Sequence, residues 1–264
     1  MILLSIVIPT KNEERNIGAC LAAFAPFEGE VELIVVDNFS SDATRRIAAE
    51  KGARVLECGP ERCAQRNFGW RAARGEFVMF VDADMIVPDE TIREIVSLLP
   101  SCDALYVREV RVGRSFRIRA RNFERSFYDG TVIDALRVVR RDLLEKTGGY
   151  DEGLIACEDW DLDRRLLALG ARTAQTMHAL CHNEAQQSLA VLLRKKAYYS
   201  ASVAAYRRKW GDDPRCRHQL GFAHRYFGVF LEKGKWRKLF SHPVLALVMY
   251  FERIAVGLTY LVKR

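Results

Sequence analysis

A short apolar segment followed directly by two aspartates constrains this chain more than any other feature of its sequence. Residues 75–85 read GEFVMFVDADM, so five consecutive apolar residues precede Asp82-Ala83-Asp84. Such a run is typical of a strand that is buried on both faces of a sheet. Two carboxylates at its end lose hydration and repel each other, and a divalent cation with oxygen ligands is the simplest compensation. A strand-terminal turn explains so short a pattern equally well, so the neighbouring segments must decide.

The first hundred residues alternate regularly between strand-like and helix-like segments. Apolar strands are expected at residues 3–9, 31–36, 54–58 and 76–81. Helical patterns fall at residues 12–24, with Asn12 as the expected N-cap, at residues 43–51 and 61–74, and from residue 88 onward. This alternation predicts an α/β fold with an open, largely parallel Rossmann-type sheet flanked by helices. In such sheets, ligands bind beyond the carboxyl ends of the strands.

Beyond residue 100 the pattern is less regular. Further strands are expected at residues 105–112, 132–139 and 173–177, and further helices at residues 116–128, 158–170 and 188–210. The last fifty residues are rich in aromatic and basic side chains. We therefore expect an α/β domain over residues 1–187 and a helical C-terminal extension over residues 188–264.

Composition narrows the classes of protein. Seven scattered cysteines without a CxxC pair argue against a disulfide framework or a zinc site, and they favour a reducing cytoplasm. The chain enters its first strand without a basic leader, so we expect no signal peptide. The formal charge of +7 suggests an anionic partner, which can be nucleotide phosphates, a membrane surface or nucleic acid. No GxGxxG follows the first strand and no GxxxxGK[ST] is present, which argues against dinucleotide-dependent dehydrogenases and P-loop enzymes.

Two apolar runs near the C-terminus, residues 245–251 and 254–262, are separated by Glu252-Arg253. This charged pair argues against a membrane-spanning helix and favours a helix that lies in the membrane interface. Glu252 and Arg253 would then face the polar side of the helix or pair with each other. Basic residues bracket the runs, as anionic lipid headgroups would require. We therefore expect peripheral association with the inner face of the membrane, and packing of the tail on the α/β domain is the alternative.

Three predicted strands end in polar clusters, at residues 9–13, 37–42 and 82–84. In a parallel sheet these clusters meet at one edge. Helix capping explains Asn12 and Asp42 taken singly, but the joint placement favours a nucleotide-diphosphate site. Asp37 can accept a hydrogen bond from a base, Asp82 can hold a ribose hydroxyl, and Asp84 can bind a metal on the diphosphate.

Six short segments appear in a fixed order: PTKNEERNI, VVDNFSSDAT, RNFG, VDADM, GGYDE and CEDWDL. Over residues 3–182 this set resembles the family-two glycosyltransferases of GT-A fold. The resemblance implies a nucleotide-sugar pocket formed by Pro9, Thr10, Asn12, Glu13, Asp37, Asp42, Arg66, Asn67 and Asp82. It implies a metal motif at Asp82 and Asp84, served by Mg²⁺ or Mn²⁺. His182 would approach the diphosphate or the metal, although a structural, hydrogen-bonded histidine is equally compatible with its position.

The resemblance also implies that the acidic pair Glu158-Asp159 supplies the catalytic base, with inversion at the anomeric carbon. A carboxylate such as Asp159 can take the proton of an attacking hydroxyl, an effect worth about 10²–10⁴ in rate. The alternative for this pair is that acidic residues at a helix N-terminus complement the helix dipole. Asp161 and Asp163 are interpreted in that way.

We therefore expect an inverting, metal-dependent glycosyltransferase that moves a sugar from a nucleotide-diphosphate sugar to a hydroxyl of a lipid-linked or cell-surface glycan. The runner-up is a polyprenyl-phosphate sugar synthase, whose phosphate acceptor needs no strong base. An alternative of another class is a non-catalytic nucleotide-sugar-binding protein. Nucleic acid is not expected as a partner, because the basic residues cluster near apolar segments and not along one helix face.

Overall fold

The computed structural model describes residues 2–183, 199 and 202–262. The chain divides into two compact units. The first comprises Met1–Glu109 and Ala135–Asn183, and the second comprises Val110–Asp134 and Glu184–Arg264. Residues 110–134 thus group with the C-terminal region, whereas the domain boundary expected from the sequence lies at residues 187–188, outside the described residues. The expected division into an α/β domain over residues 1–187 and a helical extension over residues 188–264 stays a prediction.

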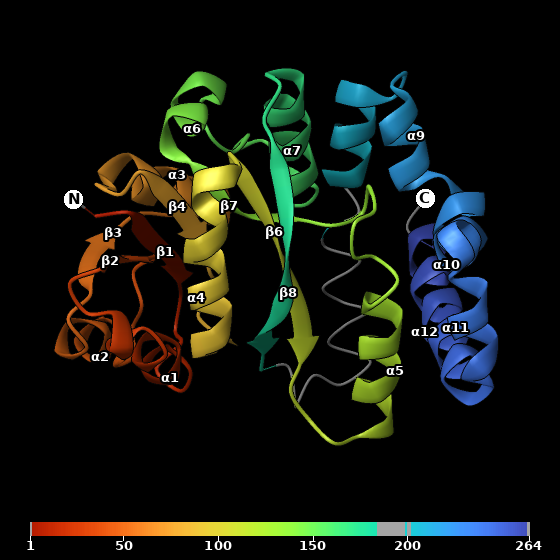
Figure 1. The fold of residues 1–264 in the computed structure, drawn as a ribbon, viewed down its shortest axis with the longest axis horizontal. Helices are drawn as coiled ribbons and strands as arrows, with labels where there is room; N and C mark the ends of the chain where they lie inside the picture. The colour runs from red at the N-terminus through yellow and green to blue at the C-terminus, as the bar shows by residue number, and fades with distance from the viewer. Residues whose placement is uncertain (1, 184–198, 200–201, 263–264) are drawn as a thin grey trace. The chain divides into compact units, whose positions relative to one another are not determined.

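The first unit is built on one sheet, eight-stranded within the described residues, in the order β3-β2-β1-β4-β7-β6-β8-β5 (Figure 1). Its parallel part comprises β1 (Leu4–Thr10), β2 (Val31–Asp37), β3 (Arg54–Glu57) and β4 (Phe77–Phe80). The other strands are β5 (Met85–Ile86), β6 (Ala104–Arg111), β7 (Leu136–Arg140) and β8 (Thr173–His182). Antiparallel pairing joins β7 to β4, β6 to β7 and β5 to β8. The four parallel strands confirm the fold class read from the sequence.

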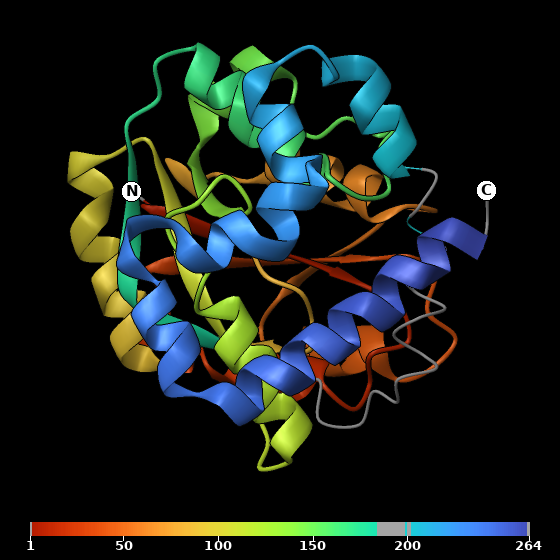
Figure 2. The same ribbon diagram turned by 90° about the vertical axis from the view of Figure 1, so that its right-hand side faces the viewer.

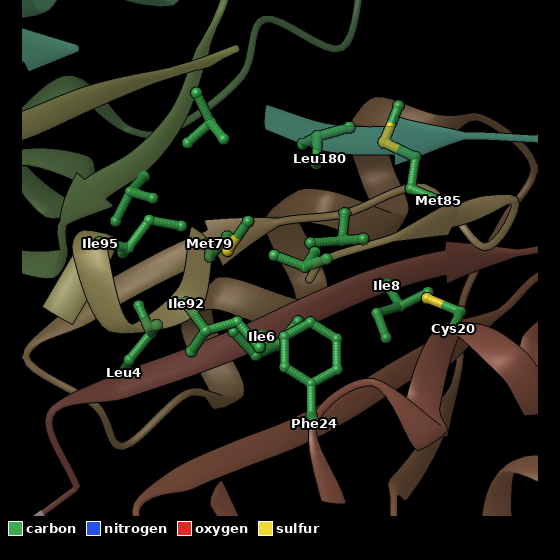
Figure 3. Close-up of a cluster of buried hydrophobic side chains, with 14 of the residues drawn as sticks. Leu4, Ile6, Ile8, Cys20, Phe24, Met79, Met85, Ile92, Ile95 and Leu180 are labelled. Carbon is green, nitrogen blue, oxygen red and sulfur yellow. The ribbon is translucent and has the colours of Figure 1, made fainter. Parts of the chain in front are cut away.

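Helices cover both faces of this sheet, because strand residues alternate between two apolar clusters. On one face, Leu4, Ile6 and Ile8 of β1 pack with α1 (Ile17–Ala22), α2 (Thr44–Glu50) and α4 (Asp89–Leu98), and Figure 3 shows the core of this cluster. On the other face, Val7 packs with α3 (Arg62–Ala72), α6 (Arg141–Thr147) and α7 (Glu158–Ala168). Short 3₁₀ turns, η1 (Ala25–Phe27) and η2 (Leu99–Ser101), complete this unit. Burial on both sides explains the unbroken apolar runs of the parallel strands.

The structure corrects three local expectations. Asn12 is not an N-cap: its φ is +54°, and its Oδ1 accepts a hydrogen bond from the backbone N–H of Ser41 at 2.9 Å, while α1 begins only at Ile17. The strand expected at residues 132–139 is restricted to β7. Helix α6 and strand β5 were not expected, because each is too short for its periodicity to be recognised.

In the second unit, α5 (Phe116–Arg125) and α12 (Pro243–Val262) lie side by side (Figure 2). The intervening elements are α9 (Pro214–Leu220), the π-helix η3 (His224–Gly228), α10 (Val229–Leu231), η4 (Glu232–Gly234) and α11 (Trp236–Ser241). Residues 202–210 are helical, and the rest of the helix expected at residues 188–210 lies outside the described residues apart from residue 199.

Charged side chains join α5 to α12. Arg117 Nε lies 2.6 Å from Glu252 Oε1, while buried Arg253 pairs with Glu124 and donates to the Tyr128 hydroxyl at 2.6 Å. Glu252 and Arg253 therefore each have a partner on or next to α5, and the expectation that they pair with each other is wrong. Within the part of the chain that the structure describes, no helix combines the length and apolar character needed to cross a bilayer.

Candidate active site

The carboxyl end of β4 places Asp84 beside His182. Strand β4 ends at Phe80, and the backbone turns at Asp82, whose carbonyl accepts the N–H of Met85 at 2.9 Å. The short β5 then pairs with the end of β8, so that Met85 lies opposite His182. His182 Nε2 consequently lies 3.0 Å from Asp84 Oδ2. The structure thus brings together two of the three residues expected to hold a metal.

The other nitrogen of His182, Nδ1, lies 3.1 Å from Oε1 of Glu109 on β6. The imidazole and the Glu109 carboxylate are both largely buried. Burial lowers the pKa of His182, but the hydrogen bonds to Asp84 and Glu109 outweigh it and raise this pKa to about 9. The ring is therefore held in one orientation by carboxylates on both sides.

Asp82 faces two buried arginines. Its Oδ1 lies 3.0 Å from Arg66 Nη2 of α3, and its Oδ2 lies 3.6 Å from Arg137 Nη1 of β7. Burial alone would raise the pKa of Asp82, but the charges of Arg66, Arg137 and Arg62 hold it well below its ordinary range. Arg137 also lies 3.2 Å from Glu109, so one charge network includes both aspartates of the motif.

Arg66 extends this network to the acidic pair at the start of α7. Its Nη1 lies 3.3 Å from both Glu158 Oε1 and Asp159 Oδ1, and Arg62 Nη2 lies 3.0 Å from the same Glu158 oxygen. Cys157, with a φ of +64°, turns the chain into the helix immediately before the pair. The loop conformation and the helix start therefore present both acids to Arg66.

The two acids differ in their environments. Glu158 is 3% exposed, and burial together with the Asp159 carboxylate raises its pKa to about 7, against the effects of Arg62 and Arg66. The Asp159 side chain is 27% exposed and has only one oxygen beside Arg66 among the contacts described. Asp159 is therefore the acid that an incoming hydroxyl can reach.

The ends of β1 and β2 form a hydrogen-bonded polar cluster around Asp37. Its Oδ1 accepts hydrogen bonds from the hydroxyls of Thr10 (3.1 Å) and Ser40 (2.5 Å), and its Oδ2 accepts the Ser40 N–H at 2.7 Å. The backbone N–H of Asn12 donates to the Ser40 hydroxyl at 2.8 Å. Asp37 is fully buried, so it fixes the two strand ends to each other and keeps limited capacity for a ligand.

Glu13 and Asp42 lie at the same edge of the sheet. The backbone N–H of Glu13 donates to the Thr44 hydroxyl at 2.7 Å, and Asp42 accepts the N–H of Glu14 at 3.2 Å. Burial raises the pKa of Glu13, and the charges of Asp84, Asp42 and Asp82 add to this effect against a hydrogen bond from Asn16. The three strand-end clusters therefore meet at one edge.

Pro9 and Asn67, which were expected to line the nucleotide-sugar pocket, are both buried against other parts of the protein. Pro9 is buried within β1, opposite Val36. Asn67 is buried and exchanges hydrogen bonds with the backbone of Tyr150, donating to its carbonyl at 2.9 Å and accepting from its N–H at 2.8 Å. It also donates to Glu152 at 2.8 Å. Asn67 therefore anchors the loop that leads to Glu158, and the structure does not bring it to the acidic cluster.

Three charged residues of the site, Arg62, Glu109 and Arg137, were not predicted. Arg137 lies inside the apolar strand β7, and a charge within a buried strand requires a partner. The sequence therefore indicated that Arg137 needs an acidic partner. The partners of Arg137, Asp82 and Glu109, come from other parts of the sheet. Only the sheet order brings them together.

The donor set of the site suits a divalent cation at Asp84 and His182. With its pKa at about 9, the His182 ring carries both protons near neutral pH and donates to both carboxylates. A divalent cation held by Asp84 and His182 would take the place of the Nε2 proton, while Nδ1–H would keep Glu109 as its acceptor. Asp82 fits less well as a direct ligand, because each of its oxygens already faces a guanidinium group. A carboxylate combined with an imidazole suits Mn²⁺ better than Mg²⁺, which prefers oxygen ligands.

An α/β sheet of this order, with an Asp-X-Asp motif and an acidic pair at one edge, defines a GT-A type fold. The sequence model of glycosyl transferase family 2 matches residues 5–148. This chain therefore belongs to glycosyl transferase family 2.

Proteins similar to this chain come from several organisms. Glucosyl-3-phosphoglycerate synthase of Mycolicibacterium smegmatis is 34% identical over 116 residues, which cover 39% of this chain and 38% of that protein. Poly(ribitol-phosphate) β-N-acetylglucosaminyltransferase TarS of Staphylococcus aureus is 32% identical over 111 residues, covering 38% and 19% of the two chains. The chain thus spans less than two fifths of the length of these relatives. The mannosyltransferase of Pyrobaculum calidifontis in complex with GDP-Man and Mn²⁺ has a TM-score of 0.67 at 20% identity, covering 98% of this chain and 86% of that one, and it shows the shared fold.

Proposed function

We propose that this protein transfers a hexosyl group, with inversion, from a nucleotide-diphosphate sugar to an acceptor hydroxyl. One observation carries the proposal: Arg66 contacts Asp82 with one nitrogen and both Glu158 and Asp159 with the other. The acidic pair therefore lies one guanidinium group away from the Asp-X-Asp motif. A base and a diphosphate site at that separation are what single displacement at an anomeric carbon requires.

The roles divide between the strand ends and the start of α7. Thr10, Asn12, Glu13, Asp37 and Asp42 line the nucleotide end, and Asp82 orients the donor through its arginine partners. Asp159 takes the proton of the acceptor hydroxyl because it is the more accessible acid. Glu158 holds Arg62 and Arg66 in place behind it. Asn67 and Pro9 support the pocket by packing and hydrogen bonding.

Asp84 and His182 would hold Mn²⁺ or Mg²⁺, with Glu109 orienting the imidazole. A divalent cation bound there supplies charge neutralisation for the leaving diphosphate. The Mn²⁺ in the complex of the Pyrobaculum calidifontis mannosyltransferase supports this assignment.

The proposed acceptor is a glycan or a lipid-linked glycan. The names of the two curated relatives each contain a phosphate-bearing compound, and the formal charge of +7 suits an anionic acceptor. A polyprenyl-phosphate acceptor remains the second candidate, supported by the exposed apolar surface of the second unit. Attack by a phosphate oxygen would leave Asp159 without an essential role.

We also propose that the second unit contacts the cytoplasmic face of a membrane. Helix α12 exposes an apolar stripe at alternating spacings of three and four residues: Val244, Leu247, Phe251, Ile254 and Leu258. Trp236 and Phe240 of α11 are also exposed, and Lys233, Arg237 and Lys238 lie in the same segment. Apolar side chains accompanied by basic ones are typical of an interfacial helix.

The test of the proposed function begins with a thermal-shift panel of nucleotide-diphosphate sugars, with and without Mn²⁺. A ligand that binds the native state raises the melting temperature. The donor that does so is then offered a lipid-linked glycan or a polyprenyl phosphate, and release of nucleoside diphosphate is measured. Metal-dependent stabilisation without release on any acceptor would favour a non-catalytic nucleotide-sugar-binding protein. A panel in which no nucleotide sugar stabilises the protein would contradict the proposal.

A further inference from the structure

A second group of metal-ligating side chains lies in the second unit and has no part in the proposed transfer. His218 belongs to α9, His224 opens the π-helix η3, and Glu232 opens η4. One ligand atom from each of the three lies within 4.8 Å of the others. Figure 1 shows α9 and α10, between which η3 runs.

The hydrogen bonds of His224 indicate a cation at this group. Its Nδ1 lies 2.9 Å from the backbone carbonyl of His218, which can only accept, so Nδ1 carries the hydrogen. In the neutral ring, Nε2 then has a lone pair, and it faces Glu232 Oε2 at 3.4 Å, another acceptor. Two acceptors that face each other need a positive charge between them. A backbone carbonyl that fixes the distal nitrogen of an imidazole is also the usual arrangement of a metal-bound histidine.

The surrounding chain is shaped to hold this ring. A side chain at Gly228 would meet His224 Cδ2 at 2.8 Å, so the π-helix packs closely against the imidazole. The His218 ring stands edge-on to it, with centroids 3.8 Å apart and an interplanar angle of 89°. Lys235 Nζ lies 3.5 Å from Glu232 Oε1, so the other carboxylate oxygen, Oε2, is the one that faces His224 Nε2. π-helical turns occur frequently at functional sites.

We propose that His218, His224 and Glu232 bind Zn²⁺, with solvent as the fourth ligand. Two imidazoles and one carboxylate are a typical zinc donor set, whereas Mg²⁺ and Ca²⁺ select oxygen ligands. The scattered cysteines without a CxxC pair argued against a zinc site, and this proposal departs from that expectation because the three ligands include no cysteine. Because the ligands come from α9, η3 and η4, the ion cross-links three elements of the second unit and stabilises it.

The test uses the full-length protein after treatment with a chelator, in an Asp84→Asn background that disables the candidate active-site metal position. Zn²⁺ alone is titrated and its stoichiometry measured by equilibrium dialysis, and Co²⁺ is titrated as a spectroscopic probe. We expect one tightly bound equivalent of Zn²⁺, visible absorption typical of tetrahedral Co²⁺ and a raised melting temperature. Adding His224→Gln or His218→Gln should weaken Zn²⁺ binding by at least about 10-fold.

His178→Gln is the matched control. His178 also pairs with a carboxylate, since its Nδ1 lies 2.9 Å from Glu94 Oε2. Among the described residues, however, His178 belongs to no group of three side chains that could hold a metal. This substitution should leave Zn²⁺ uptake unchanged. His218 is exposed, so His218→Gln tests the site even if the more buried His224→Gln destabilises the fold. Equal Zn²⁺ uptake in the parent and in His218→Gln would overturn the proposal. So would the absence of uptake in the parent, which would leave a proton shared by His224 and Glu232 as the cation.

Discussion

Glu109 Oε1 lies 3.1 Å from Nδ1 of His182, on the opposite side of the imidazole from Asp84. This carboxylate–histidine pair orients the ring nitrogen that faces the Asp-X-Asp motif. Glu109 comes from β6 and His182 from β8, which are adjacent strands in the sheet. The orientation of a proposed metal ligand therefore depends on the antiparallel part of the fold.

Glu109→Gln should weaken the Mn²⁺-dependent binding of a nucleoside diphosphate by about 10- to 100-fold, because the imidazole loses the group that orients it. Calorimetric titration with and without Mn²⁺ measures this effect independently of turnover. Glu94→Gln is the matched control, since the half-buried Glu94 also pairs with a histidine, His178, but is not part of the candidate active site. Equal Mn²⁺ dependence in Glu109→Gln and the parent would show that Glu109 does not position His182.

Asp84→Ala should abolish the Mn²⁺ dependence of nucleoside diphosphate binding while the fold survives, because the side chain contributes little to the core and carries a proposed metal ligand. Affinity measured in Mn²⁺ should fall by about 10-fold or more. Asp89→Ala, which removes an exposed aspartate paired with Arg93 at 3.0 Å, serves as control. Unchanged Mn²⁺ dependence would remove Asp84 from the site.

Asp159→Asn should reduce sugar transfer by about 10²–10⁴, because an amide cannot take the proton of the acceptor. Donor affinity should change little, since asparagine keeps the size of the side chain. Initial rates and the donor dissociation constant are measured together. Near-normal turnover would move the role to Glu158 or favour transfer to a polyprenyl phosphate.

Glu158 should make stability depend on pH near neutrality. Its pKa is raised from 4.5 in the unfolded chain to about 7 in the folded protein, so the folded state binds the proton more tightly. The stabilisation is complete below pH 4.5 and is lost as the pH rises through 7. Between pH 4.5 and 8, the free energy of unfolding of the wild type should fall relative to that of Glu158→Gln by about 1–3 kcal/mol. Denaturant titrations at several pH values measure this difference, and parallel pH profiles would contradict the assignment.

Leu247→Gln combined with Phe251→Gln should weaken the binding of the protein to anionic liposomes by at least about 10-fold. Each apolar side chain that becomes buried in the membrane contributes about 1.5–3 kcal/mol. Both side chains are exposed, so the fold should be retained. Deletion of residues 233–264 is a poorer test, since it removes buried Arg253 and its contacts with Glu124 and Tyr128. Met177→Gln, at an exposed apolar position of the first unit, is the control. Equal flotation of all variants would exclude α12 as the membrane contact.

The parallel half of the sheet and the residues at its edge could be predicted from the sequence. Strands buried on both faces produce continuous apolar runs, as in the segment before Asp82, and the polar residues that follow them must lie at the strand ends. Asp84 was singled out in this way, whereas Asp159 and His182 were expected from the resemblance to the family-two glycosyltransferases. The structure places Asp84 beside His182. Local sequence is sufficient for the residues that follow β1, β2 and β4, because adjacent parallel strands end together.

Tertiary structure alone decided the rest. Arg137 and Glu109 join the site only because β7 and β6 follow β4 in the sheet order, and no local pattern encodes that order. The network through Arg66 likewise depends on α3 and α7 covering the same face. In the second unit, Arg253 is buried because α5 supplies Glu124, more than a hundred residues earlier in the chain. Sequence periodicity reports which face of an element is apolar, whereas the partner of a buried charge is set by contacts between distant segments.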